Sequence, residues 1–170
     1  NEGLKAAETA VRMGMRVNIT LCFTQEQAAA VYAATKGAQK GQVFVSPFVG
    51  RLDDRGESGM DLVKNIIEMY KKGDGHVEVL SSSIRNTDHF LYSLSLGSDI
   101  ITTPFKIIKE WEEGGKKIPE NMQYDAKNLK QIPYKEFDIN QNWRSFDIAH
   151  ELTDIGIEKF SVDWKSLIQK

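Results

Sequence analysis

The sequence has very little cysteine and proline, with one Cys and four Pro in 170 residues, and no excess of charge of either sign. The single thiol, Cys22, excludes an intrachain disulfide and a thiolate metal cluster, and we expect it to be buried in a protein of a reducing compartment. A formal net charge of −2 argues against nucleic acid as the main partner. No apolar run approaches the roughly 20 residues of a membrane helix, and the first residues lack a signal-peptide layout. We therefore expect a cytoplasmic protein without a membrane or nucleic-acid partner.

The rest of the composition is that of an ordinary folded domain. Apolar residues make up 41% and charged residues 27%, which excludes disordered, collagen-like and low-complexity classes. A chain of this length can bury a sizeable core. It begins at Asn1 rather than Met, and Glu2–Ala7 favours a helix that is already under way. We therefore expect that the N-terminus is cut and that the chain is part of a longer protein.

Short apolar segments alternate with helical patterns over residues 1–112. Strands are expected at residues 17–23, 43–45, 77–80 and 100–102. Helices are expected at residues 3–14, 25–38, 60–70, 88–96 and 105–112, with Thr24 and Thr87 as N-caps of the second and fourth. The polar segment 46–56 is expected to be a loop. The repeated βα unit predicts parallel strands with helices outside them.

Two folds satisfy this alternation, an open doubly wound sheet and part of an eight-stranded βα barrel. In both folds, functional side chains gather at the carboxyl ends of the strands. Six polar residues lie on or just after the predicted strands: Asn18, Thr20, Ser46, Arg51, Ser83 and Arg85. Because four βα units cannot close an eight-stranded barrel, a barrel would leave half of its strands outside this chain.

Residues 113–170 lack the alternation, and we predict that they form a C-terminal extension. This segment is rich in lysine, proline and amide side chains. It also contains large apolar residues, too many for a disordered tail: Trp143, Phe146, Ile148, Leu152, Phe160, Val162, Trp164 and Leu167. We expect these side chains to pack on the barrel core or on a neighbouring subunit.

Three motifs at the predicted strand ends resemble the transaldolase family. They are Val17-Asn18-Ile19-Thr20-Leu21, Ser46-Pro47-Phe48-Val49-Gly50-Arg51 and Ser83-Ile84-Arg85-Asn86, in the family's order and at family-like spacing. The resemblance covers roughly residues 1–112, and chance agreement at three separate loops is improbable. A weaker similarity to some bacterial members is found at Asn142–Arg144 and His150–Thr153.

The resemblance implies an α/β fold, a TIM (β/α)8 barrel of which this chain supplies about the last four βα units. It also implies transfer of a dihydroxyacetone unit between sugar phosphates through a lysine Schiff base, without a metal or another cofactor. Such chemistry belongs to carbohydrate metabolism and the pentose phosphate pathway. The family's Schiff-base lysine lies on the fourth strand, a few residues before the helix that opens this chain. We therefore expect it upstream of residue 1, since Lys5 lies on that helix.

By resemblance, two catalytic residues lie on the first strand. Thr20 would order the water that relays a proton, because a hydroxyl both donates and accepts hydrogen bonds. Asn18 would hold the dihydroxyacetone portion, and Ser46 would do similar work one strand later. The residues alone leave simpler interpretations open, since threonine commonly fills strands and Ser-Pro is an ordinary strand-ending turn.

Arg51, Ser83 and Arg85 form the candidate phosphate site, with Phe48 as a wall of the substrate pocket. Guanidinium groups match phosphate oxygens in bidentate geometry, and a hydroxyl with loop N–H groups completes the shell. Taken singly, Arg51 has an ordinary alternative, a surface salt bridge with one of the acidic residues that follow it. Phe48 has an equally good interpretation as a core or lid residue.

Other chemistry-bearing residues are expected to be structural. Asp53 and Asp54 favour loop salt bridges over a divalent-ion site. His150 lacks a second histidine four residues on, so the segment is not a zinc-binding helix. His76 and His89 stand at the starts of elements and are expected to be solvated.

Three functions stay open on the sequence. A transaldolase transfers the dihydroxyacetone unit to an acceptor, whereas an aldolase of the same fold releases it free. A catalytically silent fragment would bind sugar phosphates without turnover. Because half a barrel exposes a wide apolar edge, we also expect self-association, and a homo-oligomer of the whole protein.

Overall fold

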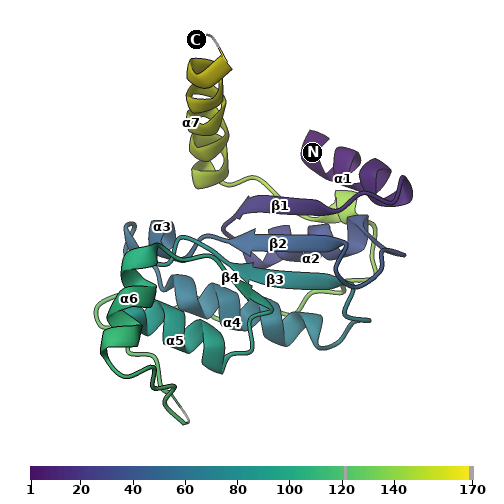
Figure 1. Cartoon of the computed structure of the whole chain (residues 1–170). Helices are drawn as coiled ribbons and strands as arrows, with labels where there is room; N and C mark the ends of the chain where they lie inside the picture. The colour runs from purple at the N-terminus through teal and green to yellow at the C-terminus, as the bar shows by residue number, and fades with distance from the viewer. Residues whose placement is uncertain (121, 169–170) are drawn as a thin grey trace.

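The computed structural model describes residues 1–120 and 122–168, in which helices alternate with short strands (Figure 1). In chain order, the elements are α1 (Glu2–Arg12), β1 (Val17–Cys22), α2 (Gln25–Ala34), β2 (Val43–Pro47), α3 (Val49–Asp53), α4 (Gly59–Tyr70), β3 (Val77–Ser81), α5 (Thr87–Ser95), β4 (Ile100–Ile101), α6 (Phe105–Glu113), the 3-10 helix η1 (Trp143–Ser145) and α7 (Glu151–Ile168). The βα alternation expected over residues 1–112 is therefore confirmed.

The strands form one parallel sheet in the order β1-β2-β3-β4. The register aligns Val17 with Val43 and Val43 with Val77, so β-branched side chains of neighbouring strands stand side by side. Val43, Val45 and Val79 are almost completely buried. Each strand pairs with its neighbour in sequence and the order never reverses, whereas a doubly wound sheet reverses at a switch point. The sheet is therefore consistent with part of a TIM barrel.

The helix starts show which cap predictions hold. Thr24 caps α2 as expected, because its hydroxyl accepts from the Gln27 N–H and the Gln27 side chain accepts from the backbone N–H of Thr24. The expectation for Thr87 is wrong. Asn86 caps α5 instead, since its Oδ1 accepts from the His89 N–H at 2.8 Å, and Thr87 is the first helical residue. An asparagine at this position satisfies the free N–H group better than the threonine that follows it.

The segment expected to be a loop, residues 46–56, contains the short helix α3. Val49 and Leu52 are spaced by three residues and are almost completely buried, so together they anchor one face of the helix. The polar residues Arg51 and Asp53 stand between and after them and conceal this pattern in the sequence. The helix follows β2 directly, and it therefore begins at the carboxyl edge of the sheet.

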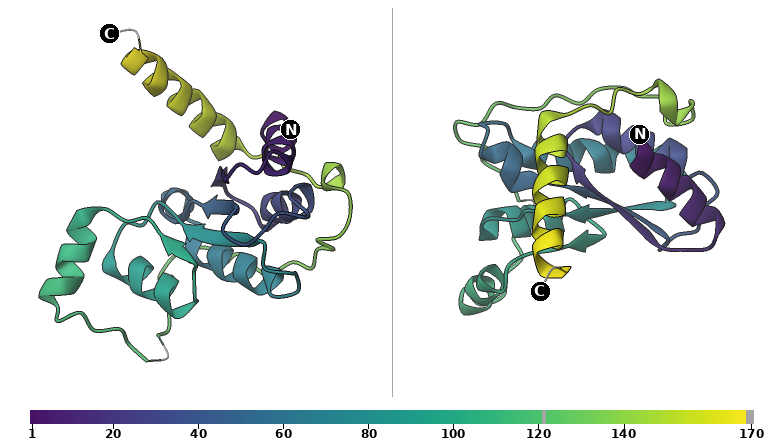
Figure 2. Two further views of the ribbon diagram at one scale, coloured as in Figure 1. Left: turned by 45° about the vertical axis from the view of Figure 1, so that its right-hand side comes forward. Right: turned by 90° about the horizontal axis from the view of Figure 1, so that it is seen from above.

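The extension returns along the helices that cover the sheet (Figure 2). Its backbone carbonyls accept from side chains of these helices: Gln25 Nε2 donates to Lys135 at 2.7 Å, and Asn65 Nδ2 donates to Ile132 at 2.8 Å. In the same extension Trp143 is buried in the core. Phe146 and Leu152 are buried with it, and the partly buried Ile148 packs against the same core.

The last helix, α7, rises from the sheet above β1 and then extends away from it (Figures 1 and 2). Beyond its second turn α7 leaves the sheet, and four of the apolar residues named above are exposed on it: Phe160, Val162, Trp164 and Leu167. Their packing on a neighbouring subunit stays a prediction. No helix in the described part of the chain is both long and apolar enough to cross a membrane.

Candidate active site

Asn18 and Thr20 share one face of β1, because strand side chains alternate. Both side chains are exposed, whereas Ile19 on the other face packs against the core. The neighbouring strand fixes the Asn18 amide: the Ser46 hydroxyl donates to Asn18 Oδ1 at 2.7 Å. Ser46 is almost completely buried, whereas Asn18 is exposed, so the contact is shielded from water on the Ser46 side. The amide oxygen is thereby held toward β2, and the two residues form one polar unit across the strands.

The loops after β2 and β3 are joined by backbone hydrogen bonds. The N–H groups of Val49 and Gly50 donate to the carbonyls of Ser82 and Ser83 at 3.0 and 2.9 Å. A side chain at Gly50 would collide with the Arg85 side chain and would lie 2.5 Å from the Ser83 carbonyl oxygen. Ser83 itself has a φ of +59°, a left-handed conformation that is costly for a residue with a side chain. The candidate phosphate loops are therefore held in close, strained contact.

Arg51 lies between two aromatic rings. Its guanidinium carbon is 5.2 Å from the ring centre of Phe48 and 5.5 Å from that of Phe160 on α7. Among the described residues it forms no salt bridge, so the alternative of a pair with Asp53 or Asp54 is wrong. The reason is that both carboxylates bind other partners: Asp53 contacts His89, and Asp54 contacts Arg85. The guanidinium of Arg51 therefore makes cation–π contacts, which leave its N–H groups available to an anion.

Arg85 lies on the adjacent loop and is half exposed. Its Nη2 lies 2.9 Å from Oδ2 of Asp54, in an ion pair that water reaches on both sides. Such an exposed pair contributes little, so a phosphate could replace the carboxylate at small cost. Phe48, directly after β2, packs edge-to-face on Phe23 at 5.8 Å between ring centres, and its ring also contacts the Arg51 guanidinium. The edge therefore presents two cations, one polar pair and one aromatic wall.

Comparison with known proteins assigns the chain to a family. A family model described as Transaldolase/Fructose-6-phosphate aldolase matches residues 1–170. The chain belongs to this family. Its resemblance to transaldolases, inferred from three strand-end motifs, is therefore confirmed.

Individual relatives support the same assignment. A probable transaldolase of Roseiflexus sp. (strain RS-1) is 34% identical over 165 residues, which are 97% of this chain and 57% of the relative. A probable transaldolase of Alkaliphilus metalliredigens is 35% identical over 168 residues, 99% of this chain and 59% of the relative. One from Myxococcus xanthus is 32% identical over 167 residues, 98% and 56%. The chain thus spans somewhat more than half the length of the curated relatives it matches.

Two histidines of this transaldolase-family chain differ from expectation. His76 and His89 are 3% and 2% exposed, so the prediction that they are solvated is wrong. His89 Nε2 lies 2.9 Å from Oδ2 of Asp53 and 3.0 Å from the hydroxyl of Tyr124, and its Nδ1 accepts from the Arg85 N–H at 3.4 Å. A buried histidine must find partners for both ring nitrogens, and His89 does so beside the candidate phosphate loops. In the sequence, the only indication that His89 lies beside these loops is its position four residues after Arg85.

Titration and metal chemistry add little at this edge. Burial raises the pKa of the Cys22 thiol to about 12, so it is an unreactive core residue as expected. Burial also lowers the pKa of His150, which stacks on Phe23. In the part of the chain that the structure describes, no three His, Cys, Asp or Glu side chains gather where they could hold a metal ion.

Phe160 is the residue that sequence analysis of this family member missed as part of the edge. It lies more than 100 positions after Arg51, in a segment without a motif, and only the path of α7 brings it near. The predicted residues themselves are arranged in two groups joined through β2. Asn18 and Ser46 form the first, with Thr20 on the same strand face, and the two arginine loops form the second.

Proposed function

We propose that the whole protein is a transaldolase, which transfers a dihydroxyacetone unit between sugar phosphates through a lysine Schiff base. The proposal is supported by the family membership, by the names of the relatives and by the arrangement of the three motifs. In this proposal, the reacting lysine lies upstream of residue 1. Residues 1–112 form the second half of a barrel and residues 113–170 the extension, in a cytoplasmic homo-oligomer.

The chemistry needs an amine, an electron sink and a proton relay. An unprotonated lysine attacks the ketose carbonyl, and loss of water gives an iminium ion. Removal of the proton from the neighbouring hydroxyl then breaks the carbon–carbon bond, an aldose phosphate leaves, and the electron pair enters the iminium to form an enamine. The enamine attacks the carbonyl of a second aldose phosphate, and hydrolysis by water frees the lysine and the new ketose phosphate.

Thr20 and Asn18 take the roles nearest the reacting carbons. A threonine hydroxyl can order the water that carries the proton, since it donates and accepts at once. Asn18 offers its NH2 group to the hydroxyls of the dihydroxyacetone unit, because its Oδ1 is already occupied by the Ser46 hydroxyl. Ser46 thereby orients Asn18 and supplies its own oxygen as an acceptor.

Arg51, Ser83 and Arg85 bind the phosphate in this proposal, and Phe48 walls the pocket beside them. Two guanidinium groups on neighbouring loops suit a doubly charged group with several acceptor oxygens. The observation that carries the proposal is the state of Arg51: within the described residues it has aromatic neighbours and no carboxylate partner. Such a cation at a strand end is ready for an anionic substrate.

The test is borohydride trapping of the full-length protein with fructose 6-phosphate, followed by peptide mass mapping. An adduct on a lysine upstream of Asn1 would support the Schiff base and its expected position. An adduct within residues 1–170, or none, would overturn the assignment and favour a protein that binds sugar phosphates without reacting. Product analysis with and without an aldose phosphate acceptor separates transfer from aldol cleavage, because only the aldolase releases free dihydroxyacetone.

A further inference from the structure

The first turns of α7 pack closely against the carboxyl end of β1. Gly156 is buried there, and a Cβ atom at this position would lie 2.6 and 2.9 Å from the methyl carbons of Leu21. The same Cβ atom would lie 3.0 Å from Nη1 of Arg51. Thr153, one turn earlier, donates its hydroxyl proton to the Leu21 carbonyl at 3.0 Å. The start of α7 is therefore fixed on the strand end and beside the guanidinium of Arg51.

Four residues after Gly156, the same helix brings Phe160 to Arg51. Residues four apart lie on the same helix face, so the close approach at Gly156 is what lets the Phe160 ring reach the guanidinium. With Phe48 at 5.2 Å and Phe160 at 5.5 Å, the cation contacts two rings supplied by segments far apart in sequence. Aromatic rings attract a guanidinium through their faces and do not consume its N–H donors.

We propose that Phe160 is a positioning residue for Arg51, through which α7 holds the guanidinium ready for the phosphate of the substrate. This inference rests on the proposed function, since it assumes a phosphate at Arg51. It gives the C-terminal helix a role in substrate affinity. Phe160 acts on the arginine and has no part in the carbon–carbon chemistry.

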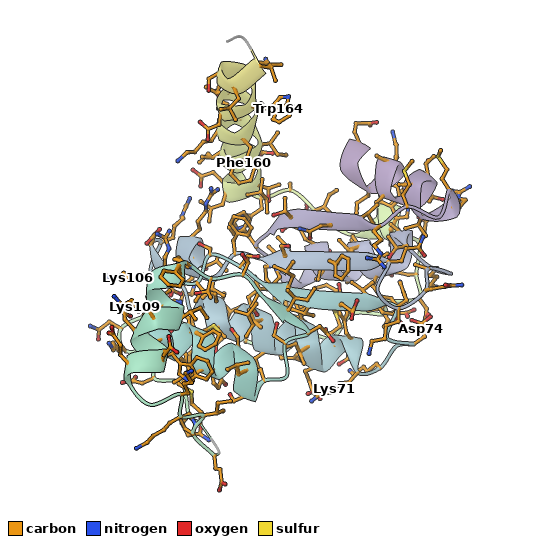
Figure 3. All side chains as sticks on the ribbon, in the orientation of Figure 1. Lys71, Asp74, Lys106, Lys109, Phe160 and Trp164 are labelled. Atoms are coloured by element: carbon orange, nitrogen blue, oxygen red, sulfur yellow. The ribbon has the colours of Figure 1, made fainter. Side chains whose placement is uncertain are left out.

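The outer part of α7 supplies a matched control. Trp164 lies one turn beyond Phe160 and farther from the sheet (Figure 3). Its side chain is 64% exposed, against 41% for Phe160. Trp164 is thus an aromatic residue of the same helix face that is farther from Arg51. Replacing it changes the helix surface and leaves the contact between Phe160 and Arg51 in place.

The experiment compares Phe160→Leu, Phe160→Tyr and Trp164→Leu in the full-length protein. The measurements are kcat and KM for fructose 6-phosphate and for fructose, and the inhibition constant of inorganic phosphate. We expect Phe160→Leu to raise the KM for the phosphorylated substrate and the inhibition constant by roughly three- to tenfold, the range of a cation–π contact, with kcat nearly unchanged. Phe160→Tyr, which keeps a ring, and Trp164→Leu should resemble the wild type.

Two results would overturn the inference alone. One is a Phe160→Leu protein whose phosphate inhibition equals that of the wild type. The other is an equal loss with fructose and with fructose 6-phosphate, which would indicate general damage to the helix. A wild-type protein that inorganic phosphate does not inhibit, and that does not turn over fructose 6-phosphate, would overturn the proposed function together with this inference.

Discussion

His89 and Asp53 join the two helices that follow the candidate phosphate loops, with Nε2 of the histidine 2.9 Å from Oδ2 of the aspartate. Asp53 stands two residues after Arg51, on α3, and His89 stands four residues after Arg85, on α5. The other oxygen of Asp53 accepts from the Gly59 N–H at the start of α4. One carboxylate therefore fixes three helices whose starts surround the two arginines.

Removal of the His89 ring should loosen this arrangement. In His89→Leu the largely buried Asp53 carboxylate loses the imidazole nitrogen that lies 2.9 Å from its Oδ2, and we expect the free energy of unfolding to fall by about 1 to 3 kcal/mol. His89→Gln keeps an N–H donor and should lose less. Urea unfolding of the two variants, with inhibition by inorganic phosphate as a second measurement, checks the expectation. Equal losses in both variants would mean that His89 matters by its volume alone.

Replacement of Gly50 by any residue with a side chain should destabilise the protein. A methyl group there meets the Ser83 carbonyl oxygen and the Arg85 side chain, so Gly50→Ala must push the two loops apart. Overpacking of this kind costs about 1 to 3 kcal/mol, and phosphate affinity should fall with it. Gly3→Ala is the control, because it lies in exposed helix with nothing within 4 Å of the new methyl group, and it should stabilise α1 by up to about 1 kcal/mol. Thermal unfolding of both variants measures these changes. A Gly50→Ala protein as stable as the wild type would contradict the close contact of Gly50 with Ser83 and Arg85.

The sequence predicts the sheet well because its signals are local. Each of β1, β2 and β3 is a short β-branched run between helical patterns, and the strand-end motifs follow from position in these runs. The βα alternation then requires that motifs far apart in sequence meet at one edge. That is why Asn18 and Ser46, 28 positions apart, could be expected together before their hydrogen bond was known.

The sequence does not predict which charged residues pair with one another, because these pairs join segments that are far apart in the chain. Arg51 has two aspartates within three positions, yet both bind groups from α5 and its preceding loop, because parallel strands bring that loop beside α3. The burial of His89 has the same origin. Phe160 reaches Arg51 only through the return of the extension and the path of α7, which depend on contacts such as Gln25 with the Lys135 backbone.

Arg85→Ala should weaken substrate binding in the full-length protein. A hydrogen bond to a charged group is worth about 1.5 to 3 kcal/mol, so KM for fructose 6-phosphate should rise on the order of 10- to 100-fold. Stability should hardly change, because the pair with Asp54 is exposed. Lys71→Ala is the control: this exposed cation pairs with Glu68 at the end of α4 that is remote from α3 (Figure 3). The measurement is steady-state kinetics, and an unchanged KM would show that Arg85 does not bind the phosphate.

Thr20→Ala should affect turnover more than binding. If its hydroxyl orders the water that relays the proton, its loss should lower kcat by about two orders of magnitude or more, with a much smaller change in KM. Thr20→Ser keeps the hydroxyl and should recover most of the activity. Thr20 is exposed on β1, so neither variant should change stability greatly. Parallel losses in kcat and affinity, without rescue by serine, would identify Thr20 as a packing residue only.

Asp74 should make stability depend on pH at the other end of the sheet. Hydrogen bonds from Tyr32 and then from His76 hold the pKa of the Asp74 carboxyl well below its usual range. Between the lowered folded pKa and an unfolded value of about 3.9, the unfolded chain binds the extra proton, so stability falls as pH falls. The contribution is complete above about pH 5. Because the carboxyl is mostly exposed, we expect it to be worth about 0.2 to 1 kcal/mol.

The matched variant is Asp74→Asn, which keeps an oxygen acceptor for Tyr32 and removes the charge. It should be less stable than the wild type at pH 7, and the difference should shrink as the pH is lowered below about 4, where the wild-type carboxylate begins to lose its advantage. Urea unfolding of both proteins at pH 7, 5, 4 and 3 measures the difference directly. A difference that stays constant over this range would show that Asp74 acts only through the shape of its hydrogen bonds and not through its charge.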